Sequence, residues 1–423
     1  MARKEKNYDK KALYLSSKYG GKITIKPTVK VRSMADLSAV YTPGIAAVSE
    51  RIVADPESSY EFTWRWNTIF IITNGTRVLG LGNEGPLASL PVMEGKSLLY
   101  KLYGGVNAIP IPIKSTDPRE FTDVVDAISI TAGGIHLEDI ASPFCFDVLE
   151  RLRERISVPV WHDDQQGTAG VTLAGLINAF KLVEKDLKTA KIVLVGAGAA
   201  NIALFNLLEK YGVNVGNIIV GDSKGPLNKN RLDIEEIKIS NRWKYNVLER
   251  SNHTGVMEID ESFDDADAIV GFSRGGSIMP SWIKRMAKKS IVFANANPTP
   301  EIWPAAAKKA GAYIVSTGRS DYPNQINNSL VFPGLFRGVL DSRAKKIDYG
   351  MIIAAAEAIA KIAERKGLKR EFILPKMGYQ NLHAVVAASV AEYASKSGNS
   401  AIRGNFEFFY KNAKNIISKG FRR

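Results

Sequence analysis

The residues of this chain that could carry out chemistry lie in three motifs upstream of a glycine-rich loop. Tyr41 lies in Val-Tyr-Thr-Pro-Gly, Lys96 ends Val-Met-Glu-Gly-Lys, and the carboxylates Glu138 and Asp139 end Gly-Ile-His-Leu-Glu-Asp. The later loop, residues 196–200, reads Gly-Ala-Gly-Ala-Ala. A proton donor, a proton acceptor, metal ligands and a nucleotide loop together indicate an oxidoreductase that acts on a metal-chelated acid.

The glycine-rich loop has the sequence context of a dinucleotide-binding turn. It follows an apolar run at 191–195 that predicts a strand, and it precedes a predicted helix that includes Ile202. Glycines here let backbone N–H groups approach a pyrophosphate at the helix N-terminus. A tight turn without a ligand is the alternative interpretation. The candidate coenzyme-binding residues are Gly196, Gly198, Ala199, Ala200, Asn201, Asp222 and Lys224.

Asp222 bears on the choice of coenzyme. It ends the next predicted strand, 21 residues beyond Asn201, close to the roughly 20 residues expected for an acid that binds the ribose. Its carboxylate favours NAD, whereas Lys224 and Lys229 are placed to hold the 2′-phosphate of NADP, so both coenzymes remain open. Asn201 stands where the pattern has glycine or alanine. We expect it to loosen the helix–strand packing slightly or to offer its amide to a phosphate.

Two pairs of carboxylates, at 138–139 and 163–164, each follow an apolar run. In α/β proteins the carboxyl edge of a sheet is where binding sites form. Neighbours on one strand point to opposite faces, so Glu138 and Asp139 can share a cation only if the strand ends there. With a third oxygen donor, water and substrate, such a cluster suits Mg²⁺ or Mn²⁺. Surface or capping roles are the alternative from the residues alone.

The hydrophobic pattern predicts an α/β protein with two domains, because 423 residues are many for one core. Strands of the first domain are expected at 68–73, 108–113 (an edge strand) and 158–162. A helix at 168–183 leads into a doubly wound parallel sheet with strands at 191–195, 218–222, 268–272, 291–294 and 312–315. Helices at 351–366 and 382–396 are expected to pack back across the domains. The proposed division is 1–167, 168–345 and 346–423, with residues 1–35 as a basic lead-in.

Composition limits the partners and the compartment. The formal net charge is +14, but many basic residues are interleaved with acidic ones, which favours solubility over a nucleic-acid partner. There is no apolar run of about 18 residues, so no membrane span is expected, and the charged start lacks a secretory signal. The single cysteine, Cys145, is interpreted as a core residue and fits a reducing cytoplasm. The expected partner is a small-molecule substrate.

Seven motifs resemble those of malic enzymes of the short prokaryotic type, in the family order and over roughly residues 35–345. They are Tyr41-Thr42-Pro43-Gly44, Val78-Leu79-Gly80-Leu81-Gly82-Asn83, Pro91-Val92-Met93-Glu94-Gly95-Lys96, Leu137-Glu138-Asp139, the run 162–169 (His-Asp-Asp-Gln-Gln-Gly-Thr-Ala), the run 296–301 (Ala-Asn-Pro-Thr-Pro-Glu) and the run 317–328. Several independent motifs in order are far more specific than any one of them. The resemblance implies a substrate and metal domain followed by a Rossmann-like domain.

The resemblance also implies roles for the matching residues. Lys96 would be the general base that takes the proton from the malate C2 hydroxyl, supported by Asp163, and Tyr41 would be the acid that protonates the enol carbon. The divalent cation would be held by Glu138, Asp139 and Asp164. The substrate would be bound by Arg77, Asn297 and Asn328, of which Asn297 and Asn328 would touch substrate or nicotinamide.

The implied reaction is oxidative decarboxylation of L-malate to pyruvate and CO₂ with reduction of NAD or NADP, dependent on Mg²⁺ or Mn²⁺. Alternatives are a dehydrogenase of another 2-hydroxy acid, an oxaloacetate decarboxylase, or a non-catalytic protein that binds nucleotide or nucleic acid. The resemblance suggests a homodimer or a multiple of one, with the amino-terminal helices at the interface. Five residues depart from the family pattern, namely Asn74, Glu84, Gln166, Asn201 and Asn295. None of them replaces a proposed acid, base or metal ligand.

Overall fold

The computed structural model describes residues 2–79 and 81–421, so Gly80 of the motif at 78–83 lies outside the described residues. The first half contains α1 (Ala2–Tyr19), α2 (Met34–Val40), α3 (Ile45–Ala54), α4 (Ser59–Phe62), β1 (Thr68–Thr73), α5 (Gly85–Leu99), β2 (Asn107–Pro112), α6 (Pro118–Ser129), β3 (Ile135–Leu137), α7 (Phe144–Arg155) and β4 (Val160–His162). Single helical turns of the 3₁₀ or π type are η1 (Pro56–Ser58), η2 (Trp64–Asn67), η3 (Tyr100–Gly104), η4 (Asp163–Gly167), η5 (Val215–Asn217), η6 (Asp260–Phe263) and η7 (Asn328–Leu330).

The second half contains α8 (Thr168–Val183), β5 (Ile192–Val195), α9 (Ala199–Tyr211), β6 (Ile218–Asp222), β7 (Gly225–Pro226), α10 (Ile234–Ser240), α11 (Arg242–Arg250), β8 (Ala268–Gly271), α12 (Pro280–Arg285), β9 (Ile291–Ala294), α13 (Pro304–Lys309), β10 (Ile314–Thr317), α14 (Phe332–Ser342), α15 (Tyr349–Glu364), α16 (Leu382–Lys396) and α17 (Phe406–Phe421). None of the helices in the described part of the chain has the length and apolar character of a membrane span.

The first sheet has four parallel strands in the order β2-β1-β3-β4. Strand β1 is buried along its whole length, as its unbroken apolar run predicts. Strand β2 is at the edge, where its prolines cost no ladder hydrogen bond. Ile72, Leu137 and His162 are register partners across β1, β3 and β4. Because the strands are parallel, the residues after Leu137 and His162 emerge side by side at one edge.

The second sheet is doubly wound, with the order β10-β9-β8-β5-β6-β7. The chain leaves β5 for β6 on one side and later crosses to β8 on the other, so the loop after β5 lies at the topological switch point, where such folds bind ligands. Among the described strands of this sheet, β7 alone is antiparallel. The predicted α/β class with a parallel Rossmann-like sheet is confirmed. One predicted strand, 312–315, is shifted to 314–317, because the Lys309–Gly311 segment still closes α13.

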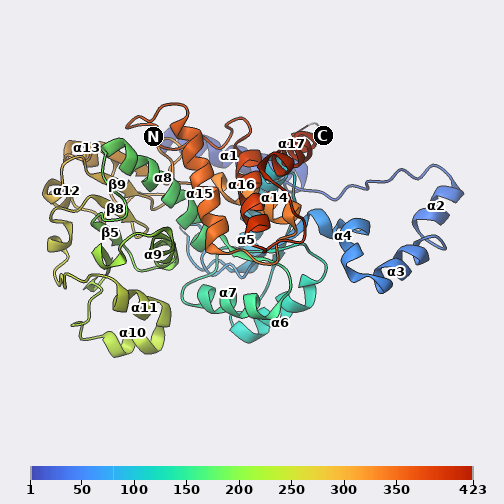
Figure 1. The fold of residues 1–423 in the computed structure, drawn as a ribbon, viewed down its shortest axis with the longest axis horizontal. Coiled ribbons are helices and arrows are strands. Elements are labelled where there is room, and N and C mark those ends of the chain that lie inside the picture. The colour runs from blue at the N-terminus through green and yellow to red at the C-terminus, as the bar shows by residue number, and fades with distance from the viewer. Residues whose placement is uncertain (1, 80, 422–423) are drawn as a thin grey trace.

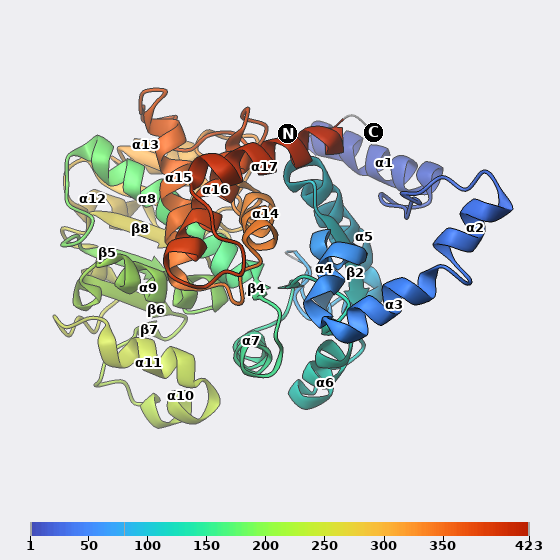
Figure 2. The ribbon, with the colours of Figure 1, turned by 45° about the vertical axis from the view of Figure 1, so that its right-hand side comes forward.

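The carboxyl-terminal helices join the two halves (Figures 1 and 2). Helix α16 packs against α14, α15 and α17, while α15 also packs on α8 of the second half. Helix α17 reaches the first half, where it packs against η3. Gly134, just before β3, is covered by the ring of Phe336 on α14. The first sheet is therefore covered in part by helices that come much later in the sequence.

One segment stands away from this body. Helices α2 and α3 form an arm at its side, with α2 at the far end in both ribbon views. Neither helix, each described in full, buries a side chain. We refer to residues 22–54, from the end of the turn after α1 to the end of α3, as the arm.

Candidate active site

Lys96 lies between two carboxylates at the carboxyl edge of the first sheet. It is on α5, a helix with a proline in its first turn, where proline costs no helical hydrogen bond. Its Nζ atom lies 2.9 Å from Glu138 Oε2 and also donates to Asp163 Oδ2. The side chain is about nine-tenths buried, and Nζ lies 4.6 Å from the centroid of the Phe332 ring.

A second layer of hydrogen bonds holds these carboxylates. The indole N–H of Trp161 donates to Asp163 Oδ1 at 3.1 Å. His136 Nε2 lies 2.6 Å from Glu138 Oε2, and its Nδ1 lies 2.7 Å from the Tyr100 hydroxyl oxygen. Burial lowers the pKa of His136 well below its usual value, so the ring is neutral. It therefore donates from Nε2 to Glu138 and accepts the Tyr100 proton at Nδ1.

The pKa of Lys96 lies above its usual value. Burial alone disfavours the ammonium form and would lower the pKa, but the negative charges of Asp163 and Glu138 raise it by more. The lysine is thus an ammonium group clamped by two carboxylates. Any process that offsets those negative charges brings its pKa down toward the range in which it can accept a proton.

Three carboxylates beside Lys96 form the candidate metal centre. Strand β3 ends at Leu137, so Glu138 and Asp139 no longer alternate as strand neighbours. Asp139 has a left-handed backbone, with φ at 52°, and its N–H donates to Asp164 Oδ2 at 3.0 Å. One carboxylate oxygen each from Glu138, Asp139 and Asp164 lies within 4.8 Å of the others.

The electrostatics of this cluster fit a divalent cation. Burial, followed by the charge of Asp164, raises the pKa of Asp139 to about 7. Asp139 Oδ2 is buried and has no hydrogen-bond partner in the described part of the chain. Acidic oxygens buried together without donors are costly unless a cation neutralises them, and hard divalent ions prefer oxygen ligands. The donor set therefore suits the predicted Mg²⁺ or Mn²⁺.

Two of the predicted substrate residues lie next to this centre. The backbone N–H of Arg77 donates to the carbonyl of Asp139 at 3.1 Å. Burial raises the pKa of Asp164, and the positive charges of Lys96 and of the exposed Arg77 offset only part of that rise. Asn328 begins η7 beside η4, since a Cβ on Gly167 would lie 3.2 Å from Asn328 Cβ. Asn297 is exposed, with its amide beside Gly318.

Tyr41 is not brought to this centre. It closes α2 in the arm, its side chain is 68% exposed, and its hydroxyl has no hydrogen-bond partner among the described residues. Sequence reasoning gave no sign of this separation, because a motif carries no information on where its segment docks. It also missed Tyr100 and Trp161. Trp161 is on β4, and Asp163, two residues later, directly follows the end of that strand; in an extended chain this spacing puts two side chains on one face.

The glycine loop has the geometry that the sequence predicts for the backbone. Gly196 has a φ of 104°, and a Cβ there would lie 2.7 Å from the carbonyl oxygen of Phe272. Gly198 is the N-cap residue of α9, and a Cβ on it would meet open space, so the side from which a pyrophosphate can approach is clear. The first N–H groups of α9, including those of Ala199 and Ala200, have no partner within the helix. This loop fits a dinucleotide.

Asn201 does neither of the two things expected of it. Its side chain is fully buried, and its amide donates to the carbonyls of Val195 and Gly196 at 3.1 and 2.8 Å. It fastens the loop to the end of β5. The side-chain amide carries two N–H donors and both carbonyls accept from it, so the asparagine stabilises the turn rather than loosening it.

Asp222 is surrounded by cations that the sequence did not single out. Its Oδ1 accepts hydrogen bonds from Lys224 N at 2.8 Å and from Arg231 at 2.9 Å, and Lys244 donates to Oδ2. These donors together outweigh the effect of burial and lower its pKa. The ammonium group of Lys224 instead lies 2.9 Å from Asp233. No spacing signal links Asp222 to Arg231 or Lys244, since they lie 9 and 22 residues away.

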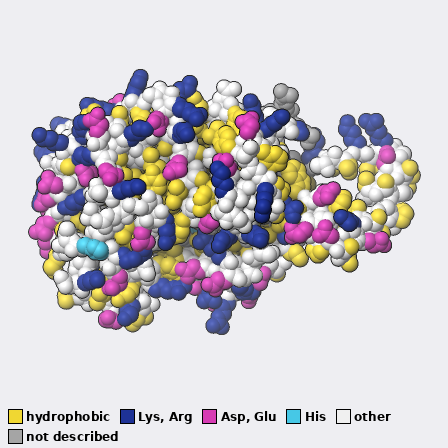
Figure 3. All heavy atoms as spheres, viewed as in Figure 1, with side chains coloured by type: hydrophobic (Ala, Val, Ile, Leu, Met, Phe, Trp, Pro, Cys, Tyr) yellow, Lys and Arg dark blue, Asp and Glu magenta, His cyan; other side chains and the backbone are white. Residues whose placement is uncertain are grey.

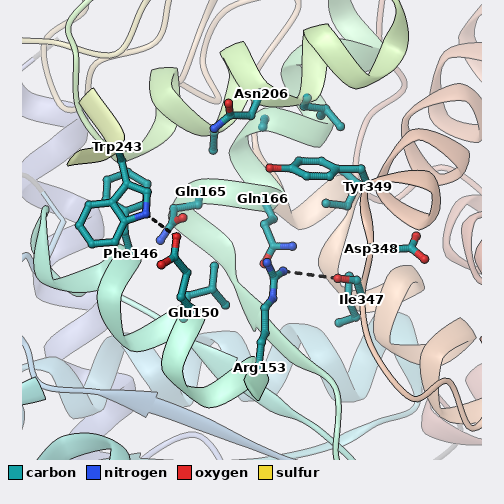
Figure 4. Close-up of a pocket in the computed structure, with 15 residues that line it drawn as sticks. Phe146, Glu150, Arg153, Gln165, Gln166, Asn206, Trp243, Ile347, Asp348 and Tyr349 are labelled. Carbon is teal, nitrogen blue, oxygen red and sulfur yellow. Dashed lines mark hydrogen bonds between the residues drawn. The ribbon is translucent and has the colours of Figure 1, made fainter. Parts of the chain in front are cut away.

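A separate hollow lies where the two halves meet (Figure 4). It has a volume of about 150 Å³ and is lined by residues of α7, η4, α9, α11 and α15. Gln165 and Gln166 face it, as does Arg153, which bonds the backbone of Ile347 at 3.4 Å. Its volume is below the ~300–1,000 Å³ of ordinary ligand pockets. Lys96 and the carboxylate cluster do not line it, so we do not assign it to the active site.

The second sheet has a dinucleotide loop at its switch point, and the first has a lysine with clustered carboxylates at its edge. This combination defines an oxidoreductase that uses a nicotinamide coenzyme and a divalent cation. Family models described as "Malic enzyme, N-terminal domain" and "Malic enzyme, NAD binding domain" match residues 20–153 and 165–395. The chain belongs to the malic enzyme family. The family, fold and NAD or NADP coenzyme predicted from the motifs are therefore confirmed.

Similar proteins cover most of the chain. The bifunctional malic/malolactic enzyme of Bacillus subtilis (strain 168) is 43% identical over 392 residues, which are 92% of this chain and 94% of the relative. The NAD-dependent malic enzyme of Geobacillus stearothermophilus is 43% identical over 383 residues, 90% of this chain and 78% of the relative. The crystal structure of malic enzyme from Pyrococcus horikoshii Ot3 has a TM-score of 0.90 and 46% identity, covering 94% and 92% of the two chains. Other relatives are named for NADP, and none of these comparisons favours the alternative functions.

Proposed function

We propose that this protein oxidises and decarboxylates L-malate to pyruvate and CO₂ with reduction of NAD or NADP. The observation that carries the proposal is the position of Lys96 Nζ, 2.9 Å from Glu138 and bonded to Asp163, beside the cluster of Glu138, Asp139 and Asp164. A base and a cation site so close together can act on the hydroxyl and a carboxylate of one small acid.

In the proposed mechanism Lys96 Nζ takes the proton of the C2 hydroxyl while Asp163 and Glu138 hold the ammonium group that forms. The bound coenzyme supplies the hydride acceptor, and a bound divalent cation supplies positive charge, which stabilises the developing enolate oxygen and offsets the carboxylates that raise the pKa of Lys96. Tyr41 then protonates C3 after the bond between C3 and the lost carboxylate breaks. The proton that Lys96 gains replaces the one that Tyr41 gives, so no net proton is consumed.

We propose further that Arg77 contacts a malate carboxylate, that Asn297 and Asn328 contact substrate or nicotinamide, and that the protein works in the cytoplasm as a homodimer or a multiple of one, without nucleic acid. The coenzyme is NAD or NADP. The carboxylate of Asp222 supports NAD, and the cations Arg231 and Lys244 beside it support NADP.

The test is coenzyme reduction followed by absorbance with L-malate and Mn²⁺, first with NAD and then with NADP, with pyruvate measured in the same samples. We expect one pyruvate per reduced coenzyme and no reaction in EDTA. Lys96→Ala should abolish malate oxidation, while Lys361→Ala, an exposed lysine of α15, should leave it unchanged. Wild-type turnover in Lys96→Ala would refute the assignment of the base.

Tyr41→Phe separates the two half-reactions. We expect it to lose decarboxylation of oxaloacetate by about 10²- to 10⁴-fold, the usual contribution of one positioned acid, while reduction of oxaloacetate to malate with reduced coenzyme is retained. Equal losses in both reactions would show that Tyr41 is not the acid.

A further inference from the structure

The hollow between the two halves of the chain has the features of a binding site outside the active site. It has a volume of about 150 Å³, and α7 of the first half faces α9, α11 and α15 of the second half across it (Figure 4). An engineered cavity of about 150 Å³ with apolar walls takes up benzene. The hollow is therefore large enough for a molecule of a few heavy atoms.

The guanidinium group of Arg153 points into this hollow without a carboxylate paired to it. Figure 4 shows it extending from α7 toward Gln166. Its Nη2 donates to the carbonyl of Ile347 at 3.4 Å, and it forms no ion pair within the described part of the chain. The side chain is accessible to solvent, as a group that lines an open hollow should be, while desolvation by the surrounding protein lowers its pKa. It remains charged and lacks the counter-ion that Arg337 has in Asp341, 2.7 Å away.

Two carboxylates line the same hollow, but each is bound elsewhere. Glu150 accepts a hydrogen bond from the indole N–H of Trp243 and is paired with Arg242. Asp348 caps the first turn of α15, where it accepts a backbone N–H at 3.0 Å. Both keep their negative charge beside the hollow, so they repel a ligand with two negative charges more than a ligand with one. The charges around Arg153 therefore favour a monoanion.

Neutral donors face the hollow beside the guanidinium group. Gln166 is only 7% exposed, and its Oε1 accepts the backbone N–H of His162 at 2.9 Å. Asn206 Oδ1 likewise accepts from Arg250 at 2.7 Å. The NH₂ groups of both amides, and the hydroxyl of Tyr349 that points into the hollow in Figure 4, have no hydrogen-bond partner among the described residues. They can donate to a ligand oxygen next to the one that Arg153 binds.

The net charge of +14 does not by itself make such a site. On the face that Figure 3 shows, basic side chains are interspersed with acidic ones. Charges at a solvent-exposed surface are also screened by salt, whereas a charge enclosed by protein is screened much less. Arg153 therefore attracts a small anion more strongly than the exposed lysines do.

We propose that this hollow binds a small monocarboxylate that has a hydroxyl or carbonyl oxygen next to its carboxylate. The carboxylate pairs with Arg153, and the neighbouring oxygen accepts from the amide of Gln166 or Asn206. The site goes beyond the proposed function, since neither Lys96 nor the carboxylate cluster lines it.

One turn of the chain links this hollow to the proposed active site. The turn η4 begins with Asp163 and Asp164, which lie beside Lys96 and in the metal cluster, and continues with Gln165 and Gln166, which face the hollow. A ligand that binds Gln166 thus restrains the turn that carries Asp163. Sites that share such an element are coupled, and the coupling of their affinities is reciprocal.

Glycolate, a small acid of this class, is the probe for binding. Its dissociation constant is measured by ligand-observed NMR with the full chain in EDTA, so that no divalent cation draws it to the carboxylate cluster. We expect a millimolar constant for the wild type and binding about 10-fold or more weaker in Arg153→Gln, because a charge-assisted hydrogen bond is lost. The matched control is Arg151→Gln, on the same helix but paired with Asp147 and outside the hollow. It should bind glycolate as the wild type does, and equal affinities of Arg153→Gln and wild type would overturn the proposal.

Two further variants separate the hollow from the active site and from a loss of folding. Arg77→Gln removes the cation assigned to a malate carboxylate and should leave glycolate binding unchanged. Ala203→Leu fills part of the hollow from α9 with Arg153 in place, and it should weaken binding while its thermal midpoint shows that the chain is folded. Loss of binding in Arg77→Gln, or wild-type binding in folded Ala203→Leu, would contradict the assignment. Displacement of glycolate by an equal concentration of inorganic phosphate would refute the preference for a monocarboxylate.

The coupling through η4 is tested by kinetics on the same variants. Competition by glycolate at the active site acts on the wild type and on Arg153→Gln alike, so any difference in their responses reports the hollow. We expect the ratio of malate KM with glycolate to KM without it to be lower in the wild type, because the ligand holds Asp163 in contact with Lys96. Equal ratios would overturn the coupling. If neither protein turns over malate, the proposed function fails, and the binding measurements still decide the site.

Discussion

Gly167→Ala is a substitution for which the structure predicts a large functional loss from the addition of a single methyl group. Gly167 ends η4 with ordinary helical angles, φ −67° and ψ −46°, so alanine fits its backbone. A Cβ at this position would nevertheless lie 2.0 Å from Asp163 Oδ1, where real contacts are essentially never under 3.0 Å. The Asp163 carboxylate must therefore move by about 1 Å. It then loses the geometry of its bonds to Trp161 and Lys96.

A displacement of about 1 Å in a catalytic group costs about 10²-fold in rate, or about 2.7 kcal/mol in the activation barrier. We expect kcat/KM for malate oxidation to fall by this factor while the thermal midpoint changes little. The control is Gly95→Ala, next to Lys96 on α5, where an added Cβ meets no atom within 4 Å. It should keep its activity and gain slightly in stability, as alanine usually does over glycine in a helix. A folded Gly167→Ala enzyme with wild-type kcat/KM would refute the positioning role of Asp163.

Three further predictions concern buried groups. Burial raises the pKa of Cys145 to about 12, so at pH 8 iodoacetamide should label it only after unfolding in urea, and rapid labelling of the native protein would contradict this burial. Burial lowers the pKa of His383 to about 3. Because the unfolded state, with a pKa near 6.5, binds the proton first, stability is lost as pH falls from about 6.5 toward 3. Between pH 7 and 5 the free energy of unfolding in urea should fall by about 2 kcal/mol less for His383→Leu than for the wild type; equal losses in the two proteins would contradict this role of His383. Asp341→Ala should cost ~3–5 kcal/mol in the same assay, because it leaves the fully buried guanidinium of Arg337, now 2.7 Å from Asp341, unpaired.

The elements that are predicted best from the sequence are those whose side chains are buried along most of their length. The runs at 68–73, 218–222 and 291–294 match β1, β6 and β9, and 168–183 and 382–396 match α8 and α16. Continuous apolar runs bounded by glycine or polar residues leave little freedom in where such elements begin. The shift of β10 shows where that rule weakens, since Ala312 and Tyr313 are as apolar as the strand that follows.

Parts of the candidate site depend on contacts that a linear pattern does not contain. The carboxylate pairs at 138–139 and 163–164 could be grouped because parallel strands bring successive strand ends to one edge, whereas Lys96 joined them only through the resemblance of its motif. The buried amide of Asn201 and the pairing of Asp222 with Arg231 arise from side-chain orientation and distant neighbours. The place of Tyr41 depends on how the arm docks. A motif shows which residue types are present, but it does not predict the surface against which its segment packs.

The contact between α17 and η3 has a consequence for how the chain is made. A ribosome delivers the strands of the first sheet early, but Gly105, which follows η3, packs against Ile416 of α17, and Gly134 packs against Phe336 of α14. The first half thus cannot finish burying its apolar surface until almost all of the polypeptide has left the exit tunnel. We expect nascent chains that end near residue 167 to be protease-sensitive and to associate with chaperones. Synthesis of the last helix then becomes the step that completes the first domain.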